Sequence, residues 1–300
     1  MKKTVFLLSI LATVCTAEAQ IVLTPNSDYC KAVNIFNPVF VRNNHISTIT
    51  GTLSVKKPMK AIRQLGLEIR YEFDDAGRLI NRYESYYRKG GHKDTLCIHY
   101  DYDELGRCMA QRKNDQYGFF LLEWEYDSAG NIIAETYSRL ENAGSSKRHF
   151  SPGRIYRIRE EKYTYSKPSP NQIKKTSFNS ADRPYKEGIS IFDEMGNLAE
   201  RNERYIVTNK RWRTAYIYDK HNRLSVKTAY GSFEERDSTR HSFSYDTLGN
   251  IEEEKVLQNE RPVLLLQFLY DKASMLLDAR LEKDENSGNI GITRYRYEFR

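Results

Sequence analysis

The stretch Tyr100-Asp101-Tyr102-Asp103-Glu104-Leu105-Gly106-Arg107 sets the pattern of this 300-residue chain. Variants of it recur from about residue 71 to the C-terminal end. Aligned on the Asp or its equivalent, eight steps from position 74 to position 298 give a mean spacing of 28 residues. Self-similarity at a period of roughly 20–50 residues is typical of repeat architectures. The sequence therefore predicts an array of repeated structural units.

Each unit has the residue chemistry of a β-hairpin. Its aromatic–polar–aromatic run alternates as a strand does, which places both rings on one face. Asp suits the first corner of a type I turn because its carboxylate accepts backbone N–H groups, and Gly or Asn three residues later supplies a positive φ. We expect these turn roles for Asp74, Gly77, Asp103, Gly106, Asp127, Gly130, Asp193, Gly196, Asp219, Asn222, Asp246 and Gly249.

The turn chemistry also predicts the strand register. If the Asp pairs with the residue after the Gly, each hairpin places an aromatic residue opposite an aliphatic one. The predicted pairs are Phe73 with Leu79, Tyr126 with Ile132, Tyr218 with Leu224, and Tyr245 with Ile251. The spacing does not match a calcium loop, which needs carboxylates at positions 1, 3 and 5 before its Gly, so we predict neither a metal nor a cofactor.

These residues resemble the signature Tyr-Asp-x-x-Gly-Arg/Asn-Leu of the YD-repeat (Rhs-repeat) family, over about residues 71–300. The resemblance implies a long antiparallel β-meander that winds into a spiral or a hollow shell. It also implies one of three contexts: bacterial surface proteins, toxins that hold a C-terminal effector inside the shell, or modules linked to carbohydrate binding. The sequence departs from the toxin pattern because no effector domain follows the repeats. The family's repeat carries no catalytic residue.

Residues 1–19 have the features of a secretory signal peptide: a positively charged start, a short apolar stretch and an A-x-A cleavage site that ends at Ala19. We expect export with cleavage after Ala19, and a periplasmic, cell-surface or extracellular location. The alternative is a lipoprotein with Cys15 as the lipidated residue, which Val14 disfavours. No later apolar run is long enough to predict a membrane span.

The rest of the chain divides into two predicted parts. Residues 20–66 lack the motif and are expected to form capping strands over the first edge of the meander. Residues 67–300 form the repeat domain, in which residues 136–188 are irregular and rich in proline, so long loops or edge strands are expected there. Two strands per repeat give roughly 16–20 strands with the cap. A sheet of this size should curl into a spiral or shell, or split into stacked sheets. The predicted class is all-β.

Composition narrows the choice of partners. The net charge of +7 comes from acidic and basic residues interleaved along the chain, which predicts solvated strand faces and no nucleic-acid partner. The chain beyond the signal peptide has three cysteines: Cys30, Cys97 and Cys108. We expect them to be small buried residues, with a disulfide that involves Cys30 as the alternative. The absence of a C-x-x-C pattern argues against a zinc or thioredoxin-type site.

The sequence determines the function less closely than it determines the fold. The sequence contains no H-E-x-x-H, G-x-S-x-G, P-loop or dinucleotide fingerprint, so a hydrolase or another enzyme is disfavoured. We predict a secreted, non-enzymatic protein that binds or scaffolds at the cell envelope, with a glycan as its ligand. Trp212, with Arg211 and Arg213 beside it, is the candidate ligand-binding cluster, because an exposed ring can stack on a sugar. The alternative is a β-shell that docks or encloses a protein partner.

Overall fold

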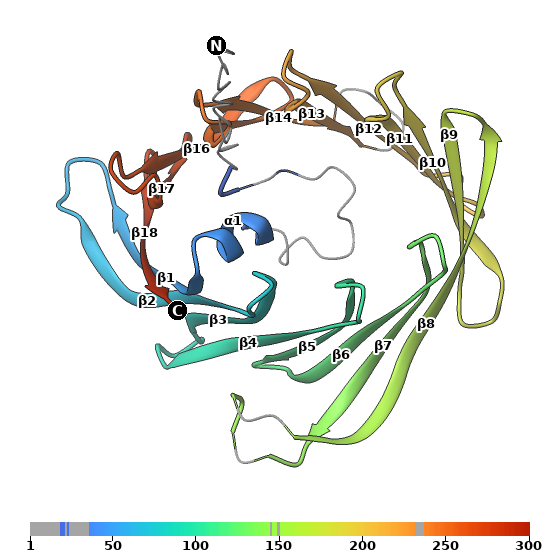
Figure 1. Cartoon of the computed structure of the whole chain (residues 1–300), viewed down its shortest axis with the longest axis horizontal. Helices are drawn as coiled ribbons and strands as arrows, with labels where there is room; N and C mark the ends of the chain where they lie inside the picture. The colour runs from blue at the N-terminus through green and yellow to red at the C-terminus, as the bar shows by residue number, and fades with distance from the viewer. Residues whose placement is uncertain (1–18, 22, 24–35, 145, 149–150, 232–236) are drawn as a thin grey trace, which may run out of the picture.

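The computed structural model describes residues 19–21, 23, 36–144, 146–148, 151–231 and 237–300. The signal peptide up to residue 18, Cys15 and Cys30 lie outside these residues. Within them the chain forms one short helix and 18 antiparallel strands that follow one another around a closed barrel (Figure 1). The elements are α1 (Pro38–Asn43), β1 (Ile46–Lys56), β2 (Arg63–Phe73), β3 (Leu79–Tyr87), β4 (Lys93–Tyr102), β5 (Cys108–Asp115), β6 (Gly118–Tyr126), β7 (Ile132–Asn142), β8 (Pro152–Ser169), β9 (Gln172–Phe178), β10 (Pro184–Phe192), β11 (Leu198–Tyr205), β12 (Arg211–Tyr218), β13 (Leu224–Tyr230), β14 (Ser238–Tyr245), β15 (Ile251–Gln258), β16 (Arg261–Tyr270), β17 (Leu277–Asp284) and β18 (Ile290–Phe299).

The first strand closes the barrel. Ile49 in β1 lies opposite Tyr297 of β18 on one side and opposite Tyr71 of β2 on the other. The all-β class and the antiparallel hairpin order are confirmed, but the sheet closes on itself where we expected a spiral, a shell or stacked sheets. A strand with neighbours on both sides is not an edge cover. The segment 20–66 therefore supplies the closing strand and a helix, and the meander has no first edge to cap.

The predicted hairpin register is confirmed. Phe73 pairs with Leu79, and the other three aromatic–aliphatic pairs match in the same way. A register shift next to each pair marks a bulge, as the turn chemistry requires. In the first hairpin the Gly77 N–H donates to the Asp74 carbonyl at 2.9 Å, and Gly77 has a φ of +79°. The turn is therefore a type I turn followed by a residue in the left-handed region.

The residue after the Gly completes each motif turn. Arg107 donates its backbone N–H to one carboxylate oxygen of Asp103 at 2.8 Å and its side-chain Nε to the other at 2.7 Å. Asn131 bonds to Asp127 in the same way, and these hydrogen bonds hold the pKa of the Asp127 carboxyl below its ordinary value. The remaining pairs are Arg78 with Asp74, Asn197 with Asp193, Arg223 with Asp219, and Asn250 with Asp246.

The second aromatic residue of the motif joins each hairpin to the one before it. The Tyr102 hydroxyl donates to the backbone carbonyl of Leu79 at 2.7 Å, across from one repeat to the preceding one. The same bond recurs from Tyr126 to Cys108, Tyr165 to Ile132, Tyr218 to Leu198, Tyr245 to Leu224, Tyr270 to Ile251, and Tyr297 to Leu277. We call these seven bonds the tyrosine staples. They explain why Tyr stands at this position in seven of the nine motifs, because Phe, which stands there at positions 73 and 192, has no donor.

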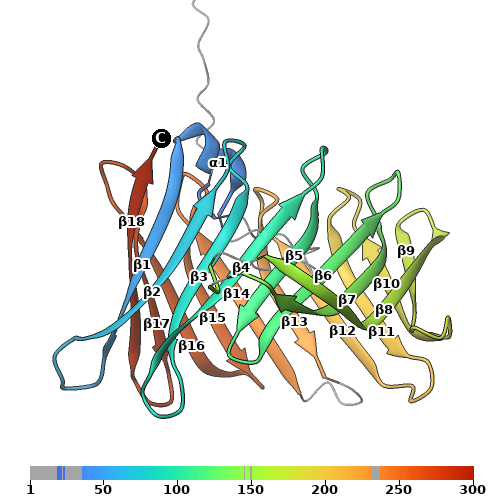
Figure 2. The same ribbon diagram turned by 90° about the horizontal axis from the view of Figure 1, so that it is seen from below.

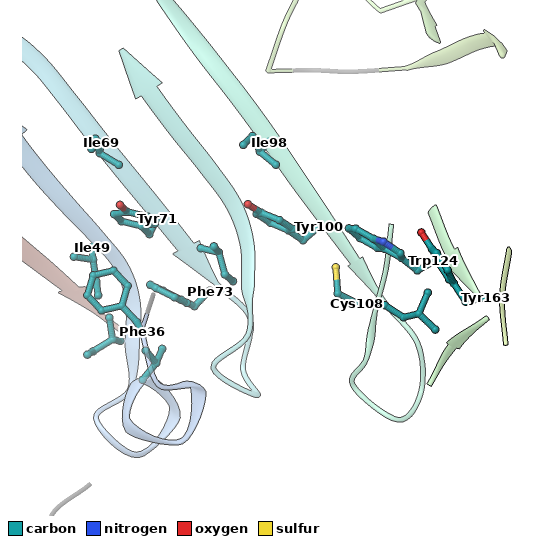
Figure 3. Close-up of a cluster of buried hydrophobic side chains, with 14 residues drawn as sticks. Phe36, Ile49, Ile69, Tyr71, Phe73, Ile98, Tyr100, Cys108, Trp124 and Tyr163 are labelled. Carbon is teal, nitrogen blue, oxygen red and sulfur yellow. The ribbon is translucent and has the colours of Figure 1, made fainter. Parts of the chain in front are cut away.

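The helix α1 lies inside the ring of strands and defines the inner face of the wall (Figure 1). Phe36, just before it, packs edge-on against Tyr71 with ring centroids 5.2 Å apart, and belongs to the largest buried cluster (Figure 3). The turn at Gly77 approaches so closely that a Cβ atom there would overlap the carbonyl oxygen of Pro38. Both α1 and the end of β18 lie at the same rim of the barrel (Figure 2).

The outer face carries many ion pairs beside a smaller number of rings, such as Tyr230. Arg70 pairs with Glu72 at 2.8 Å, and Arg112 pairs with Asp101 at 2.5 Å. These side chains alternate with the inner-face aromatic residues along the same strands, so the pleat separates a ring-lined face from a charged face. In the part of the chain that the structure describes, no helix is long and apolar enough to cross a membrane.

The segment 136–188 is more regular than its prolines predicted. It contains β8, an 18-residue strand, and three connections, which lie at residues 143–151, 170–171 and 179–183. However, β8 pairs with β7 only from Pro152 to Lys162 and with β9 only from Lys162 to Ser169. Each half of β8 therefore has one neighbour.

Candidate binding site

The predicted cluster at Trp212 is divided by the pleat of β12. Trp212 lies opposite Glu203 and Arg213 lies opposite Asn202 on the neighbouring strand, so the two side chains occupy opposite faces. The Trp212 ring packs edge-on against Tyr205 on the inner face, with centroids 5.2 Å apart. Arg211 and Arg213 point outward. All three residues contribute to the lining of one groove, although the Trp212 side chain lies on the other face of the strand.

The outward residues line a groove of about 630 Å³ on β10–β13. Arg213 spans this groove: it pairs with Glu200 at 2.7 Å, and its guanidinium lies 5.4 Å from the centre of the Tyr230 ring. Arg204 pairs with Glu187 at 2.8 Å. Because these carboxylates already neutralise the arginines, the groove offers a compensated ion-pair network to a ligand.

A larger cavity of about 810 Å³ lies on the inner face between β6 and β11. Its wall combines tyrosine rings with charged side chains, which come from strands far apart in the sequence. The residues used below are Glu135, Glu161, Tyr163, Lys175, Tyr185 and Lys186. Sites that bind small polar molecules are concave and combine ring surface with a few fixed polar groups, so this cavity is the better candidate.

Two glutamates form the polar centre of the cavity. Arg159 bridges them, with 3.1 Å from its Nη2 to Glu135 and 3.3 Å from its Nε to Glu161. Glu161 also accepts hydrogen bonds from the hydroxyls of Tyr163 at 3.1 Å and Tyr185 at 2.7 Å. Burial raises the pKa of the Glu135 carboxyl, and the nearby charge of Glu161 adds to this rise. The two carboxylates are thus held in place by donors from several strands.

A lysine lies over the ring side of the same cavity. The Lys175 ammonium is 3.5 Å from the centre of the Tyr163 ring, in cation–π geometry. Burial and the positive charge of Lys186 lower the pKa of Lys175 to about 7. Lys186 itself pairs with Glu203 at 2.5 Å. The cavity therefore holds acceptors and donors side by side, with one cation whose charge changes near neutral pH.

No group of three His, Cys, Asp or Glu side chains among the described residues is arranged to hold a metal ion. Cys97 and Cys108 are both free and buried, and burial raises the pKa of the Cys97 thiol. The predicted buried role fits their positions, while Cys30 lies outside the described residues. A thiol with a raised pKa is a poor nucleophile.

The sequence matches no family model, and no curated protein matches it either. Among solved structures, it is similar to a porin-like protein from Bacteroides uniformis, with 11% identity and a TM-score of 0.40, over 84% of this chain and 98% of that one. It is also similar to a porin-like protein from Bacteroides vulgatus, with 12% identity and a TM-score of 0.32 over the same shares. A third similarity is to the Photorhabdus luminescens Tc holotoxin pore, with 12% identity and a TM-score of 0.29, over 77% of this chain and 15% of that one.

Proposed function

We propose that this protein is an exported barrel of the YD-repeat type that binds a glycan in its inner cavity, at the cell envelope and without catalysing a reaction. The observation that carries the proposal is the wall of the cavity, where the rings of Tyr163 and Tyr185 surround two carboxylates held by Arg159. Sugar rings have apolar faces and equatorial hydroxyl groups. Such a ligand suits flat aromatic surface placed beside fixed donors and acceptors.

The same hydrogen bonds argue for binding over hydrolysis. A glycosidase uses one carboxylic acid to protonate the leaving group and a second carboxylate as base or nucleophile. Here Glu161 already accepts two tyrosine hydroxyls and Arg159, and Glu135 accepts the indole N–H of Trp124 at 3.1 Å and Arg159. Groups engaged in this way orient a ligand well, but they are poorly placed to transfer protons to it.

A glycan array of the protein from residue 20 onward tests the proposal. We expect binding that persists at high salt and is lost in Tyr185→Ala, while Tyr117→Ala, on an exposed ring in the β5–β6 turn, binds as the native chain does. Trp212→Ala tests whether the ring on the inner face next to the cavity contributes to binding. This substitution should weaken binding less than Tyr185→Ala does. Binding that disappears with salt would identify only the attraction of anions to a basic protein, and would refute the proposal.

One observation favours a second candidate, a barrel that encloses polypeptide. The inner face already holds a segment of its own chain: Gln20 is fully buried and accepts the Leu277 N–H at 2.8 Å. Its side-chain N–H donates to the Tyr297 hydroxyl at 2.8 Å, and its backbone N–H donates to Asn250 at 3.0 Å. A wall that binds the polar groups of one segment in this way could bind another polypeptide segment. Capture of a protein that competes with the glycan would support this candidate.

A further inference from the structure

The barrel wall is incomplete on one side of β8. From Pro152 to about Glu160 this strand pairs with β7, while β9 begins its pairing only at Lys162 (Figure 1). Ser180 marks the boundary: its hydroxyl accepts the Glu160 N–H at 3.1 Å and donates to the Glu160 carbonyl at 3.0 Å. Among the described residues, no strand pairs with the free side of residues 153–159, which we call the β8 edge.

A free edge of this kind is a template for strand addition. Its outward N–H and C=O groups lack a ladder partner, and an extended segment of another chain can supply one. Proteins protect such edges with very short strands, bulges or charges. The β8 edge is seven residues long, but its pairing with β7 is irregular at two places, so residues 155–157 form its regular part. Its charges further restrict which extended segment can add to it.

The side chains of the β8 edge combine apolar and basic surface. Ile155 and Ile158 are 56% and 55% exposed, which is unusual for isoleucine in a strand. Arg154 and Arg157 are also exposed, and Arg157 pairs with Glu160 at 2.6 Å, within the same strand. A strand laid against this edge would therefore meet aliphatic contacts and positive charge on both of its faces, because residues three apart in a strand lie on opposite faces.

We propose that the β8 edge docks an extended, acidic segment of a partner protein, which adds to the barrel wall as a further strand. Acidic side chains on that segment would lie across from Arg154 and Arg157, and its aliphatic side chains would cover Ile155 and Ile158. A second copy of this chain is the poorer occupant. If the isoleucines of two β8 edges faced each other, Arg154 of one copy would lie opposite Arg159 of the other, and like charges opposite each other destabilise a pair.

Three peptides test the proposal against the full-length barrel by fluorescence anisotropy. The first is eight residues long and has glutamate and valine each at every third position, with threonine between them, so that glutamates can lie across from both arginines and valines across from both isoleucines. The second has the same composition with a central proline added, which removes a ladder donor, and the third has lysine in place of each glutamate. We expect binding of the first alone, weakened about tenfold or more by Arg154→Glu with Arg157→Glu. Arg261→Glu, an exposed arginine in β16, is the matched control and should leave binding unchanged.

The outcomes separate strand addition from the alternatives. Equal binding of the first two peptides would mean that charge alone attracts them, and would overturn the proposal. Absence of binding up to about 1 mM peptide would overturn it as well. A concentration-dependent dimer that Arg157→Glu abolishes would assign the edge to a second copy instead. Thermal unfolding of each variant verifies that the barrel is intact, since all three arginines are exposed.

Discussion

Removing one tyrosine staple should destabilise the barrel by a measurable amount. Tyr245→Phe keeps the ring, and with it the contact to Arg223, whose guanidinium lies 4.4 Å from the ring centre. It removes the hydroxyl that donates to the Leu224 carbonyl at 2.6 Å. A lost hydrogen bond that leaves a partly buried acceptor without that donor costs about 1–2 kcal/mol. In a chain of this size, this amount should lower Tm by several degrees.

Urea unfolding followed by circular dichroism is the measurement. The midpoint should fall while the slope m stays constant, because the substitution changes stability and not the surface exposed on unfolding. Tyr117→Phe is the control: that ring is 73% exposed, and its change should stay within about 0.5 kcal/mol. If both variants unfold at the native midpoint, the staples contribute nothing to stability, and the reasoning about Tyr in the motif is refuted.

Three further predictions rest on single positions. Gly77→Ala should displace α1 and destabilise the barrel far more than Gly130→Ala does. Both glycines have positive φ, but only at Gly77 would a Cβ atom overlap a neighbour. A comparison of the Tm values of the two variants tests this. Lys175→Met should stabilise the protein at pH 6, and its advantage should shrink above pH 7, where the native lysine loses its charge; unfolding midpoints at pH 6 and 9 test the sign. The lowered pKa of Asp127 contributes stability above the ordinary pKa of about 4 that is lost as the pH falls below it, so Asp127→Asn should flatten the acid limb of an unfolding titration.

The sequence was sufficient for everything local to one repeat. The Asp and Gly positions and the pairing of Phe73 with Leu79 follow from turn chemistry, which depends on only a few neighbouring residues. The role of the residue after Gly could also have been read from the sequence, since Arg or Asn stands there in all six complete motifs. In the same way, Asn37 followed by Pro38 is a helix start, and the structure has α1 there.

The candidate site could not be predicted because it depends on how strands meet. Glu135 comes from β7 and Lys175 from β9, and they line one cavity because the long strand β8 pairs with β7 over its first part and with β9 over its last part. Nearness in sequence was a poor guide to which side chains share one face of a strand. Arg211, Trp212 and Arg213 are consecutive, and for that reason a strand places them on alternate faces. A search by strand parity would have placed Trp212 with the inner rings.

The position of β1 has a consequence for how the molecule assembles. Of the 18 strands, β1 emerges first from any vectorial synthesis or export, and one of its two partners, β18 (Ile290–Phe299), emerges last. Every intermediate hairpin can form from local contacts, but the ring cannot shut until β18 has been delivered. A long-range closing step of this kind is slow, and it leaves two strand edges open in the meantime. The growing chain should therefore be most prone to aggregation just before β18 arrives.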